Sequence, residues 1–373
     1  MELWGIFGCS LMIALIVAAA LSNLMVLICF LGCADIRGQV PGLFTLNLTL
    51  CNLLLIAINM PLTLVGAVRG HQLGEEGLCR AVGFLETFLT SNSMLSMAAL
   101  SIDRWVAVVF PLSYQSKMRY RDAAVILLYS WIHSLSFPTV ALCLSWVGFH
   151  HTYGSCTLLN KNPEEGASFL AFMVLFHLLS FFVSFLVLCV TYLQVLKVAR
   201  SHCRRIDVIT MQTLVLLVDL HPSVRQRCLE EQKRRRQRAT KKIITFRGTF
   251  LLCFTPYVIT RLVEISSSTT ISAQWGIFSR YFAYSKALSD PFVYCLTRNQ
   301  YKNCCRDMVN KLLKRSSGNS VQRANSYMGN MVPNSGNSVQ RANSYMGNMV
   351  PNSGNSVQRA NSYMGNMVPT TSG

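Results

Sequence analysis

The sequence predicts an all-α membrane protein: a bundle of seven transmembrane helices, a short amphipathic eighth helix and a disordered cytoplasmic tail. Three observations lead to this prediction. Hydrophobic residues make up 51% of the 373 residues and charged residues only 13%, which is too apolar for a soluble globular protein. The apolar residues gather in seven stretches of membrane-spanning length. The basic residues, which give a net charge of +18, gather in loops on one side.

Seven apolar stretches are the predicted transmembrane helices. We place them at Ile6–Leu31, Leu43–Val68, Leu78–Phe110, Ala123–Val147, Ala167–Val198, Ile243–Ile265 and Ile271–Leu296. The first stretch is not a cleaved signal peptide, because no basic region precedes it and its apolar run is longer than a signal requires. We therefore expect residues 1–5 to be a short extracellular N-terminus and residues 6–298 to form the bundle.

The loop charges predict which side of the membrane each end faces. Arg37, Arg119 and the basic third intracellular loop, at about 199–241, lie on one side, whereas the opposite loops contain few bases. By the positive-inside rule, the N-terminus is extracellular and the C-terminus is cytoplasmic. We expect a multi-pass plasma-membrane protein whose basic loops face anionic membrane lipids, and no nucleic-acid partner.

Two cysteines differ from the others in lying on the predicted outer side. Cys79 is at the start of the third stretch, and Cys156 is in the loop after the fourth. Because this side is oxidising, we expect a disulfide that ties the loop over the bundle, with two free thiols as the alternative.

The segment after the bundle has two parts. Residues 299–315 show the apolar and basic pattern of an amphipathic helix on the inner leaflet, where Cys304 and Cys305 are candidates for palmitoylation or remain free thiols. Residues 316–373 contain three copies of an 18-residue repeat whose Asn/Ser/Gly/Pro composition predicts disorder. One serine of each copy fits a basophilic kinase site and, when phosphorylated, could recruit arrestin-like proteins; a duplication without function is the alternative. These serines are Ser326, Ser344 and Ser362.

Other functions of membrane proteins find no support in the sequence. A transporter would need a polar path or inverted repeats with broken helices, and neither is present. The sequence has no Ser/His/Asp set and no His cluster with metal-ligand spacing. We expect no enzyme activity, no catalytic residue, no metal and no cofactor.

Short motifs occur in a fixed order along the predicted helices. The third helix ends with Asp103-Arg104-Trp105, the sixth contains Phe254-Thr255-Pro256, and the seventh contains Asp290-Pro291-Phe292-Val293-Tyr294. Further motif residues are Asn23, Asn52, Pro111, Trp131, Tyr192, Phe250 and Tyr301. On these motifs the chain resembles the rhodopsin-like (class A) G-protein-coupled receptors over residues 5–315. Segments 95–105 and 220–229 resemble a pair of orphan receptors within that family, so the resemblance implies a class of activity but no ligand.

The resemblance implies that the chain passes a signal to a heterotrimeric G protein. In the family, the motif arginine, here Arg104, is held by its neighbouring acid, here Asp103, and is released on activation. The resemblance assigns an activation switch to Asp103, Arg104, Trp105, Tyr192, Arg236, Phe250, Phe254, Pro256, Asp290, Pro291 and Tyr294. Trp105 stands where the family more often has tyrosine.

Two positions depart from the family pattern near the switch. The acid that often restrains the motif arginine from the base of the sixth helix is replaced by Arg236, which either repels Arg104 or only faces lipid headgroups. The family's sodium-binding aspartate is replaced by Asn52, a poorer ligand for a hard cation.

A lysine is positioned to take the place of that sodium ion. Lys286 precedes Asp290 by four residues on the same helix face, so we expect Asn52, Ser93, Lys286 and Asp290 to form a collapsed sodium site that is neutralised from within. Phe254 replaces a frequent tryptophan, and Ser184 replaces a proline that forms a bulge in the fifth helix. Together these departures predict ligand-independent signalling.

A buried acid marks a candidate ligand pocket. Glu86 lies two turns into the third helix, and with Phe254, Tyr257 and Tyr284 it would suit a cationic ligand. The alternative is an internal ion pair from Glu86 to Lys286 or Arg261. The ligand is therefore an unknown small molecule, or the receptor has none.

The resemblance and the basic residues at the cytoplasmic start of the sixth helix favour the stimulatory G protein, which raises cyclic AMP. The alternatives are another G protein with dependence on an unknown amine or lipid ligand, or a receptor-like scaffold that does not couple.

Overall fold

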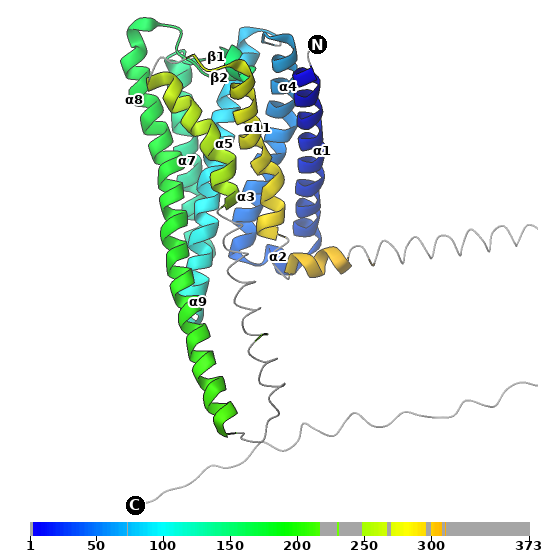
Figure 1. Ribbon diagram of the computed structural model, residues 1–373, viewed down its shortest axis with the longest axis vertical. Helices are drawn as coiled ribbons and strands as arrows, with labels where there is room; N and C mark the ends of the chain where they lie inside the picture. Colours follow the sequence, from blue (N-terminus) through cyan, green and yellow to red (C-terminus); the bar gives the residue numbers. More distant parts are fainter. Residues whose placement is uncertain are drawn as a thin grey trace, which may run out of the picture. The chain divides into compact units, whose positions relative to one another are not determined.

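The computed structural model describes residues 3–72, 74–216, 230, 248–266, 270–295, 300–307 and 310. Its long helices run side by side as a bundle (Figure 1). The helices are α1 (Leu3–Gly32), α2 (Ala34–Arg37), α3 (Val40–Leu54), α4 (Met60–Arg69), α5 (Glu76–Val109), α6 (Tyr114–Lys117), α7 (Tyr120–Cys143), α8 (Gly166–His177), α9 (Val183–Leu216) and α11 (Ala273–Asp290). A further helix covers Gly248–Ser266, and residues 300–307 are helical.

π-helical turns, which are wider than α-helical ones, interrupt or end three of the long helices. Leu55–Asn59 joins α3 to α4, Leu178–Phe182 joins α8 to α9, and Pro291–Cys295 follows α11. Such turns rotate the register of the side chains that follow and are frequent at functional sites. The turn before α9 corrects one expectation, because this helix bulges although Ser184 stands in place of the proline.

The membrane spans follow from helix length and apolarity. Within the described residues, five helical segments are long and apolar enough to cross a bilayer, and α5 with the turn that follows it makes a sixth. The remaining long helix, α11, carries Arg280, Lys286 and Asp290. These charges are buried, whereas Trp275 and Phe278 of the same helix are exposed, so α11 turns its charged side chains toward the interior of the bundle.

Local chemistry sets several helix ends. The Asp122 carboxylate accepts a hydrogen bond from the Arg119 backbone N–H at 2.9 Å, which fixes the start of α7. Gly70 ends α4 with a φ of 72°, a left-handed conformation that glycine adopts without steric cost. The chain leaves α7 at Cys143, four residues before the predicted end, because Ser145 also adopts a positive φ and turns the chain into a strand.

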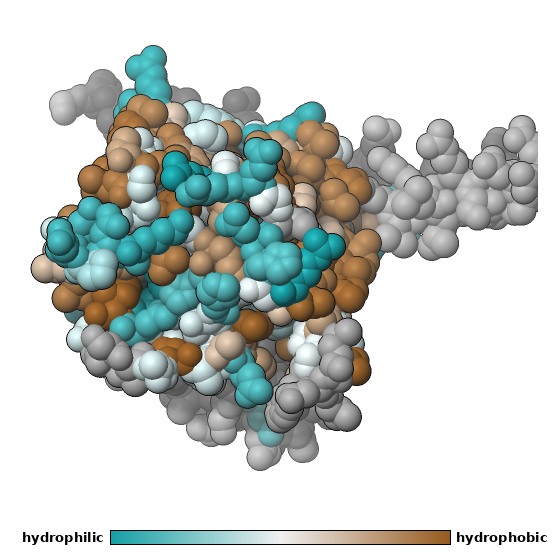
Figure 2. Space-filling model, turned by 90° about the horizontal axis from the view of Figure 1, so that it is seen from above, coloured by the Kyte–Doolittle hydropathy of each residue, from teal (hydrophilic) through white to brown (hydrophobic). Residues whose placement is uncertain are grey.

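A β-hairpin covers one end of the bundle, the end that the loop charges predict to face outside and that is called the outer end below. Strands β1 (Val147–His150) and β2 (Ser155–Leu158) pair antiparallel, with Val147 opposite Leu158 and His150 opposite Ser155. Hydrophilic side chains spread across this end of the molecule and hydrophobic ones lie around its edge (Figure 2). That distribution fits a bundle with a lipid-facing circumference and a wet end.

α5 lies at the centre of the bundle and packs against α3, α7 and α9. Its buried Met94, Met97 and Leu100 join a core with Phe44 and Leu48 of α3. Tyr301 and Cys304, from the helical residues 300–307, belong to the same core. α9 continues to Leu216 and so extends into the segment predicted as the third intracellular loop.

Candidate functional site

The Asp-Arg motif lies near the C-terminal end of α5, which is predicted to face the cytoplasm. Asp103 is buried and accepts a hydrogen bond from the Tyr114 hydroxyl at 2.7 Å, whereas Arg104 is exposed. Trp105 packs edge-on against Phe110, with ring centroids 5.9 Å apart. Tyr114 was missed by sequence reasoning, because it lies 11 residues after Asp103, at the start of the short helix α6, and carries no charge.

Side chains of the π-helical turn before α9 and of the helix Gly248–Ser266 form an aromatic stack in the core. Phe250 is fully buried and stacks on Phe181, with ring centroids 5.5 Å apart and planes at 9°. Phe254 meets Phe250 edge-on at 5.2 Å. The Pro256 carbonyl accepts a hydrogen bond from Thr260 at 2.6 Å. The π-helical turn Leu178–Phe182 supplies Phe181, so the fifth transmembrane helix and the proline-containing helix contact each other through this stack.

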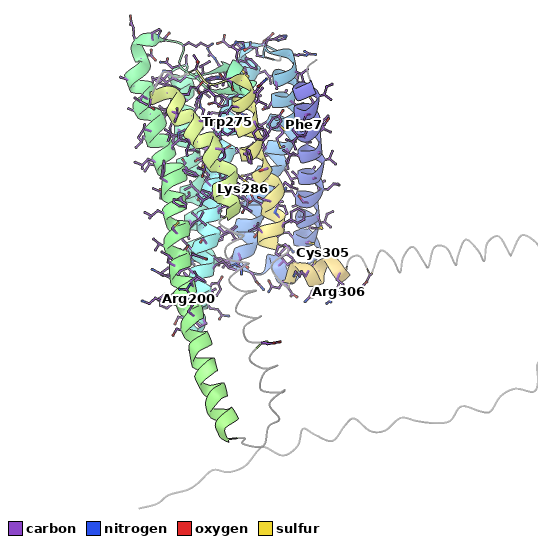
Figure 3. All side chains as sticks on the ribbon, in the orientation of Figure 1. Phe7, Arg200, Trp275, Lys286, Cys305 and Arg306 are labelled. Atoms are coloured by element: carbon purple, nitrogen blue, oxygen red, sulfur yellow. A yellow bond between two sulfur atoms is a disulfide. The ribbon has the colours of Figure 1, made fainter. Side chains whose placement is uncertain are left out.

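A polar cluster occupies the middle of the bundle, where the collapsed sodium site was expected. The Asn52 amide donates hydrogen bonds to Asp290 at 3.1 Å and to Asn23 at 3.3 Å. Lys286, labelled in Figure 3, lies midway along the bundle. It forms an ion pair with Asp290, which is one helical turn away. Asn23 also donates to the Ala287 carbonyl at 2.8 Å. The ammonium group of Lys286 therefore stands beside the carboxylate that would otherwise require a metal cation.

Glu86 has a different partner from the two that the sequence indicated. It forms a buried ion pair with Arg280 of α11, not with Lys286 or Arg261. The Tyr284 hydroxyl donates to Glu86 at 3.1 Å and accepts from the Arg280 guanidinium at 3.1 Å. Arg261 lies on the helix Gly248–Ser266, and Arg280 and Lys286 lie on α11. The sequence does not give the rotation of α11 in the bundle, and this rotation decides which base faces α5.

Arg261 is engaged by the outer hairpin. Its guanidinium donates to the Leu158 carbonyl at 2.5 Å and to Glu264 at 2.9 Å. Tyr153, at the hairpin tip, is fully buried and donates to Glu264 at 2.8 Å. Its ring lies 5.5 Å from that of Tyr257. The hairpin tip therefore reaches into the outer end of the candidate ligand pocket.

Little space is left between these side chains. A cavity of about 20 Å³ remains, which is room for about one water molecule. Its walls include residues of both the candidate pocket and the sodium site: Asn52, Glu86, Ser93, Phe254, Tyr257, Arg280, Tyr284 and Lys286. In this conformation the candidate ligand pocket is filled by the protein itself.

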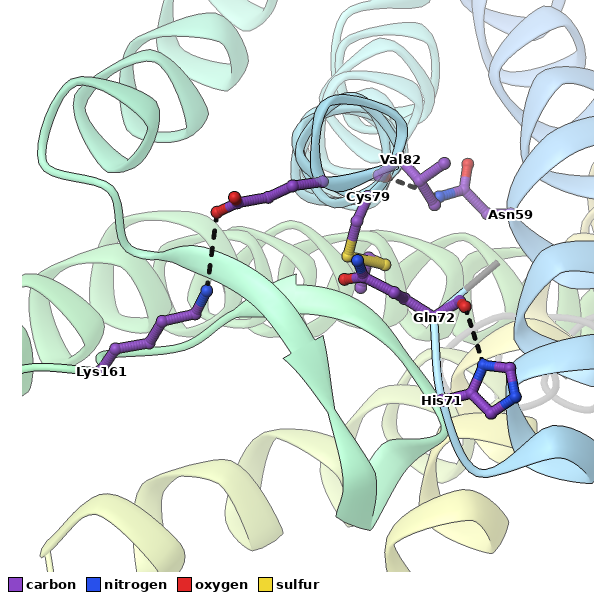
Figure 4. The surroundings of a disulfide bond; sticks show 8 residues. Asn59, His71, Gln72, Cys79, Val82 and Lys161 are labelled. Atoms are coloured by element: carbon purple, nitrogen blue, oxygen red, sulfur yellow. Dashed lines mark hydrogen bonds and ion pairs between the residues drawn. A yellow bond between two sulfur atoms is a disulfide. The ribbon is translucent and has the colours of Figure 1, made fainter. Parts of the chain in front are cut away.

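A disulfide joins the hairpin to α5. Cys79 and Cys156 are bonded, with Cα atoms 5.3 Å apart (Figure 4). Beside this bond, the Asn59 amide donates to the Val82 carbonyl at 2.9 Å and connects the second helix to the third. The covalent link holds β2 against the outer end of the bundle.

A second disulfide lies near the helical residues 300–307. It joins Cys33 to Cys304. Cys304 therefore has no thiol for palmitoylation in this structure, whereas Cys305 keeps its thiol. Among the other predicted site residues, the side chain of Tyr294 and all of Arg236, Ser326, Ser344 and Ser362 lie outside the described residues.

The hairpin should loosen as the pH falls, because His150 is half-buried beside other charges. Burial, together with nearby Arg261 and Arg280, lowers the pKa of His150 below its ordinary value near 6.5, and a contact to Glu264 at 3.2 Å only partly offsets this. The unfolded chain then binds a proton more readily than the folded one, so stability is lost as the pH falls below about 6.5. We expect the thermal midpoint to drop between about pH 7 and pH 5, and the drop to shrink in His150→Gln. His71→Gln is the control, because His71 is exposed; an unchanged drop in His150→Gln would contradict the assignment.

Comparison with known proteins places these features in a family context. Residues 22–294 match the family model "7 transmembrane receptor (rhodopsin family)". The chain is 60% identical to "G-protein coupled receptor 26" of Homo sapiens over 334 residues, which cover 89% of this chain and 99% of that protein. It is 48% identical to "G-protein coupled receptor 78" of Homo sapiens over 306 residues, covering 82% and 84% of the two chains. It is 23% identical to "5-hydroxytryptamine receptor 4" of Homo sapiens over 309 residues, covering 78% of each.

Proposed function

We propose, since the chain belongs to the rhodopsin family of seven-transmembrane receptors, that it signals across the plasma membrane without an added ligand and raises cyclic AMP through the stimulatory G protein. The observation that carries this proposal is the filled pocket. Glu86, the one acid placed to bind a cationic ligand, is paired with Arg280 and accepts from Tyr284. A ligand would have to break this buried pair before it could bind.

The outer hairpin supports the same proposal. Tyr153 occupies the outer end of the pocket and is held by Glu264, while Arg261 binds the hairpin backbone at Leu158. The disulfide from Cys156 to Cys79 keeps these contacts in place. The hairpin thus makes the contacts to the third, sixth and seventh transmembrane helices that a bound ligand would make, at no cost in association entropy.

The polar cluster supports ligand-independent signalling from the middle of the bundle. In the family, a sodium ion held by an aspartate and a serine, here Asn52 and Ser93, favours the inactive state. Here Asn52 supplies an amide in place of that carboxylate, and Lys286 neutralises Asp290. An ion that does not bind cannot stabilise the inactive state.

Orientation and modification complete the proposal. The basic loops place the N-terminus outside and the C-terminus in the cytoplasm, beside the G protein and anionic lipid. Cys305 is the thiol of the pair Cys304 and Cys305 that remains available for palmitoylation. The tail serines Ser326, Ser344 and Ser362 are proposed phosphorylation sites for arrestin-like partners.

Basal cyclic AMP tests the proposal directly. Cells that express the wild type should show a level several-fold above mock-transfected cells, and Arg104→Ala at equal surface expression should return it to the mock level. Asn52→Asp should lower it in part, because it restores a sodium-binding carboxylate. Arg121→Ala, an exposed base on the same inner side, is the control and should signal like the wild type.

Two outcomes would contradict the proposal. A wild-type signal equal to mock cells would reject ligand-independent activity. A signal that persists in cells without the stimulatory α subunit would reject the choice of G protein.

A further inference from the structure

The two disulfides of the described chain lie at opposite ends of the bundle. Cys79–Cys156 is beside the outer hairpin, and Cys33–Cys304 is beside α2 and the helical residues 300–307, where Figure 3 labels Cys305. Whichever way the bundle is inserted, one of the two disulfides faces the cytosol. The positive-inside rule assigns that side to Cys33–Cys304.

The inner disulfide belongs to a group of four cysteines. Cys29 and Cys33 are one helical turn apart at the end of α1, and Cys304 and Cys305 are adjacent in the helical residues 300–307. The Cys29 and Cys305 sulfurs lie 3.2 Å apart, and the Cys304 sulfur lies 3.7 Å from the Cys29 carbonyl oxygen. The fold therefore presents two sulfur pairs that join the same two segments.

The redox environment of the cytosol determines whether these four cysteines form disulfides. Glutathione and thioredoxin keep cytosolic thiols reduced, and the disulfides that do form there are usually transient and redox-sensing. A disulfide on this side is therefore not a permanent crosslink. We propose that Cys29, Cys33, Cys304 and Cys305 form a redox-controlled crosslink between the first helix and the helical residues 300–307, and that hydrogen peroxide is the oxidant.

Burial within each pair fits a two-step oxidation. Cys33 and Cys305 are half-buried, whereas their partners Cys304 and Cys29 are buried, so in each pair peroxide reaches one sulfur first. That thiolate attacks one peroxide oxygen; an S–O bond forms, the O–O bond breaks and water leaves. The buried thiol then attacks the same sulfur; an S–S bond forms, the S–O bond breaks and a second water leaves. Two thiols lose two electrons and two protons, and the peroxide is reduced to two waters.

The crosslink would act next to the signalling machinery. Cys29, Cys304 and Tyr301 are in the same core as Val293 and Phe250. Oxidation would fix residues 300–307 against α1, and reduction would release them. Palmitoylation of Cys305 and its bond to Cys29 exclude each other, because both use the same sulfur.

Trypsin gives a direct assay for this crosslink. Residues 1–37 contain no Lys or Arg before Arg37, and cleavage after Lys302 and Arg306 releases residues 303–306, which contain Cys304 and Cys305. Cells expressing the full chain are treated with hydrogen peroxide, their thiols are blocked with N-ethylmaleimide at lysis, and non-reduced peptides are weighed by mass spectrometry. The crosslinked mass of 1–37 with 303–306 should rise several-fold with peroxide and disappear with dithiothreitol.

Variants separate the two sulfur pairs. Cys29→Ser with Cys305→Ser should keep the crosslink through Cys33 and Cys304, and Cys33→Ser with Cys304→Ser should keep it through Cys29 and Cys305. Cys29→Ser with Cys33→Ser should abolish it. Cys9→Ser is the matched control on the same peptide and should leave it unchanged.

The outer disulfide serves as an internal reference. The bond from residues 70–80 to residues 122–161, through Cys79 and Cys156, should be present with and without peroxide. An inner crosslink that never forms, or that is complete in untreated cells, would overturn the proposal.

The inference rests on the proposed orientation, and an inverted chain is recognised because the disulfide Cys79–Cys156 would then be the peroxide-dependent one. The readout is a peptide mass, so a failure to couple to a G protein does not affect it.

Discussion

Replacing Arg280 by methionine should destabilise the receptor by about 3–5 kcal/mol, because it leaves the Glu86 carboxylate buried without its counter-ion. Both side chains of the pair are nearly inaccessible to water, at 1% and 9% exposure. The Tyr284 hydroxyl donates one hydrogen bond to Glu86, which does not replace a full positive charge. Thermal unfolding of the detergent-solubilised protein, followed by tryptophan fluorescence, measures the loss.

The double variant decides whether the missing charge is the cause. Glu86→Gln with Arg280→Met removes both charges and should recover most of the lost stability, since a neutral pair has no desolvated ion. Arg80→Met is the control, because it breaks the exposed Arg80–Glu76 ion pair on the same helix and should have little effect. A double variant as unstable as Arg280→Met alone would show that lost packing, and not an unpaired charge, explains the single variant.

Composition and periodicity were enough to predict the fold. Seven apolar stretches and one-sided basic loops predicted a helical bundle, and the observed helices follow them to within a few residues at most ends. The largest exception is α9, which continues to Leu216, well past the predicted end at Val198. A second exception has a local cause: α7 stops early at Cys143, because the backbone turns at Ser145 and the apolar run continues into a strand that apolarity alone cannot distinguish from helix.

The partners within the site were harder to predict than its members. Glu86 and Tyr284 were named from the sequence, and the structure brings them together. The ion pair expected from Glu86 to Lys286 or Arg261 was wrong, and the partner is Arg280, because helical spacing fixes a face but not its rotation in the bundle. In contrast, the pair Lys286 and Asp290 followed directly from the four-residue spacing.

Two contacts had no signal in the sequence. The hydrogen bond from Tyr114 to Asp103 crosses a loop, and the burial of Tyr153 depends on where the disulfide holds the hairpin. Sequence patterns report local periodicity, whereas these contacts depend on how the chain folds back on itself.

Sodium should stabilise the protein once the positive charge of Lys286 is removed. In the wild type, Lys286 neutralises Asp290 and Asn52 offers an amide, so the thermal midpoint should be the same in sodium chloride and in choline chloride. In Asn52→Asp with Lys286→Ser, the carboxylates of residues 52 and 290 and the Ser93 hydroxyl would lie near the cavity, which has room for about one water molecule. The variant should be less stable than the wild type in choline chloride, because two buried carboxylates repel each other. Sodium at ten times its Kd should then restore about 1.4 kcal/mol.

The single variants distinguish ion binding from a general salt effect. Lys286→Met leaves Asp290 buried with only the Asn52 amide and should lose about 3–5 kcal/mol, with a weaker response to sodium than the double variant. Asn52→Asp keeps Lys286, whose charge weakens sodium binding, so its thermal midpoint should respond to sodium less than that of the double variant. An equal response to sodium in the wild type and the double variant would mean that the ion binds elsewhere or acts by screening, and that Lys286 does not occupy the place of the ion. A response that is absent from the wild type and largest in the double variant would show that one lysine replaces the ion by which the family stabilises its inactive state. The basal signal of the double variant should then fall as sodium rises, since the ion binds the inactive conformation preferentially.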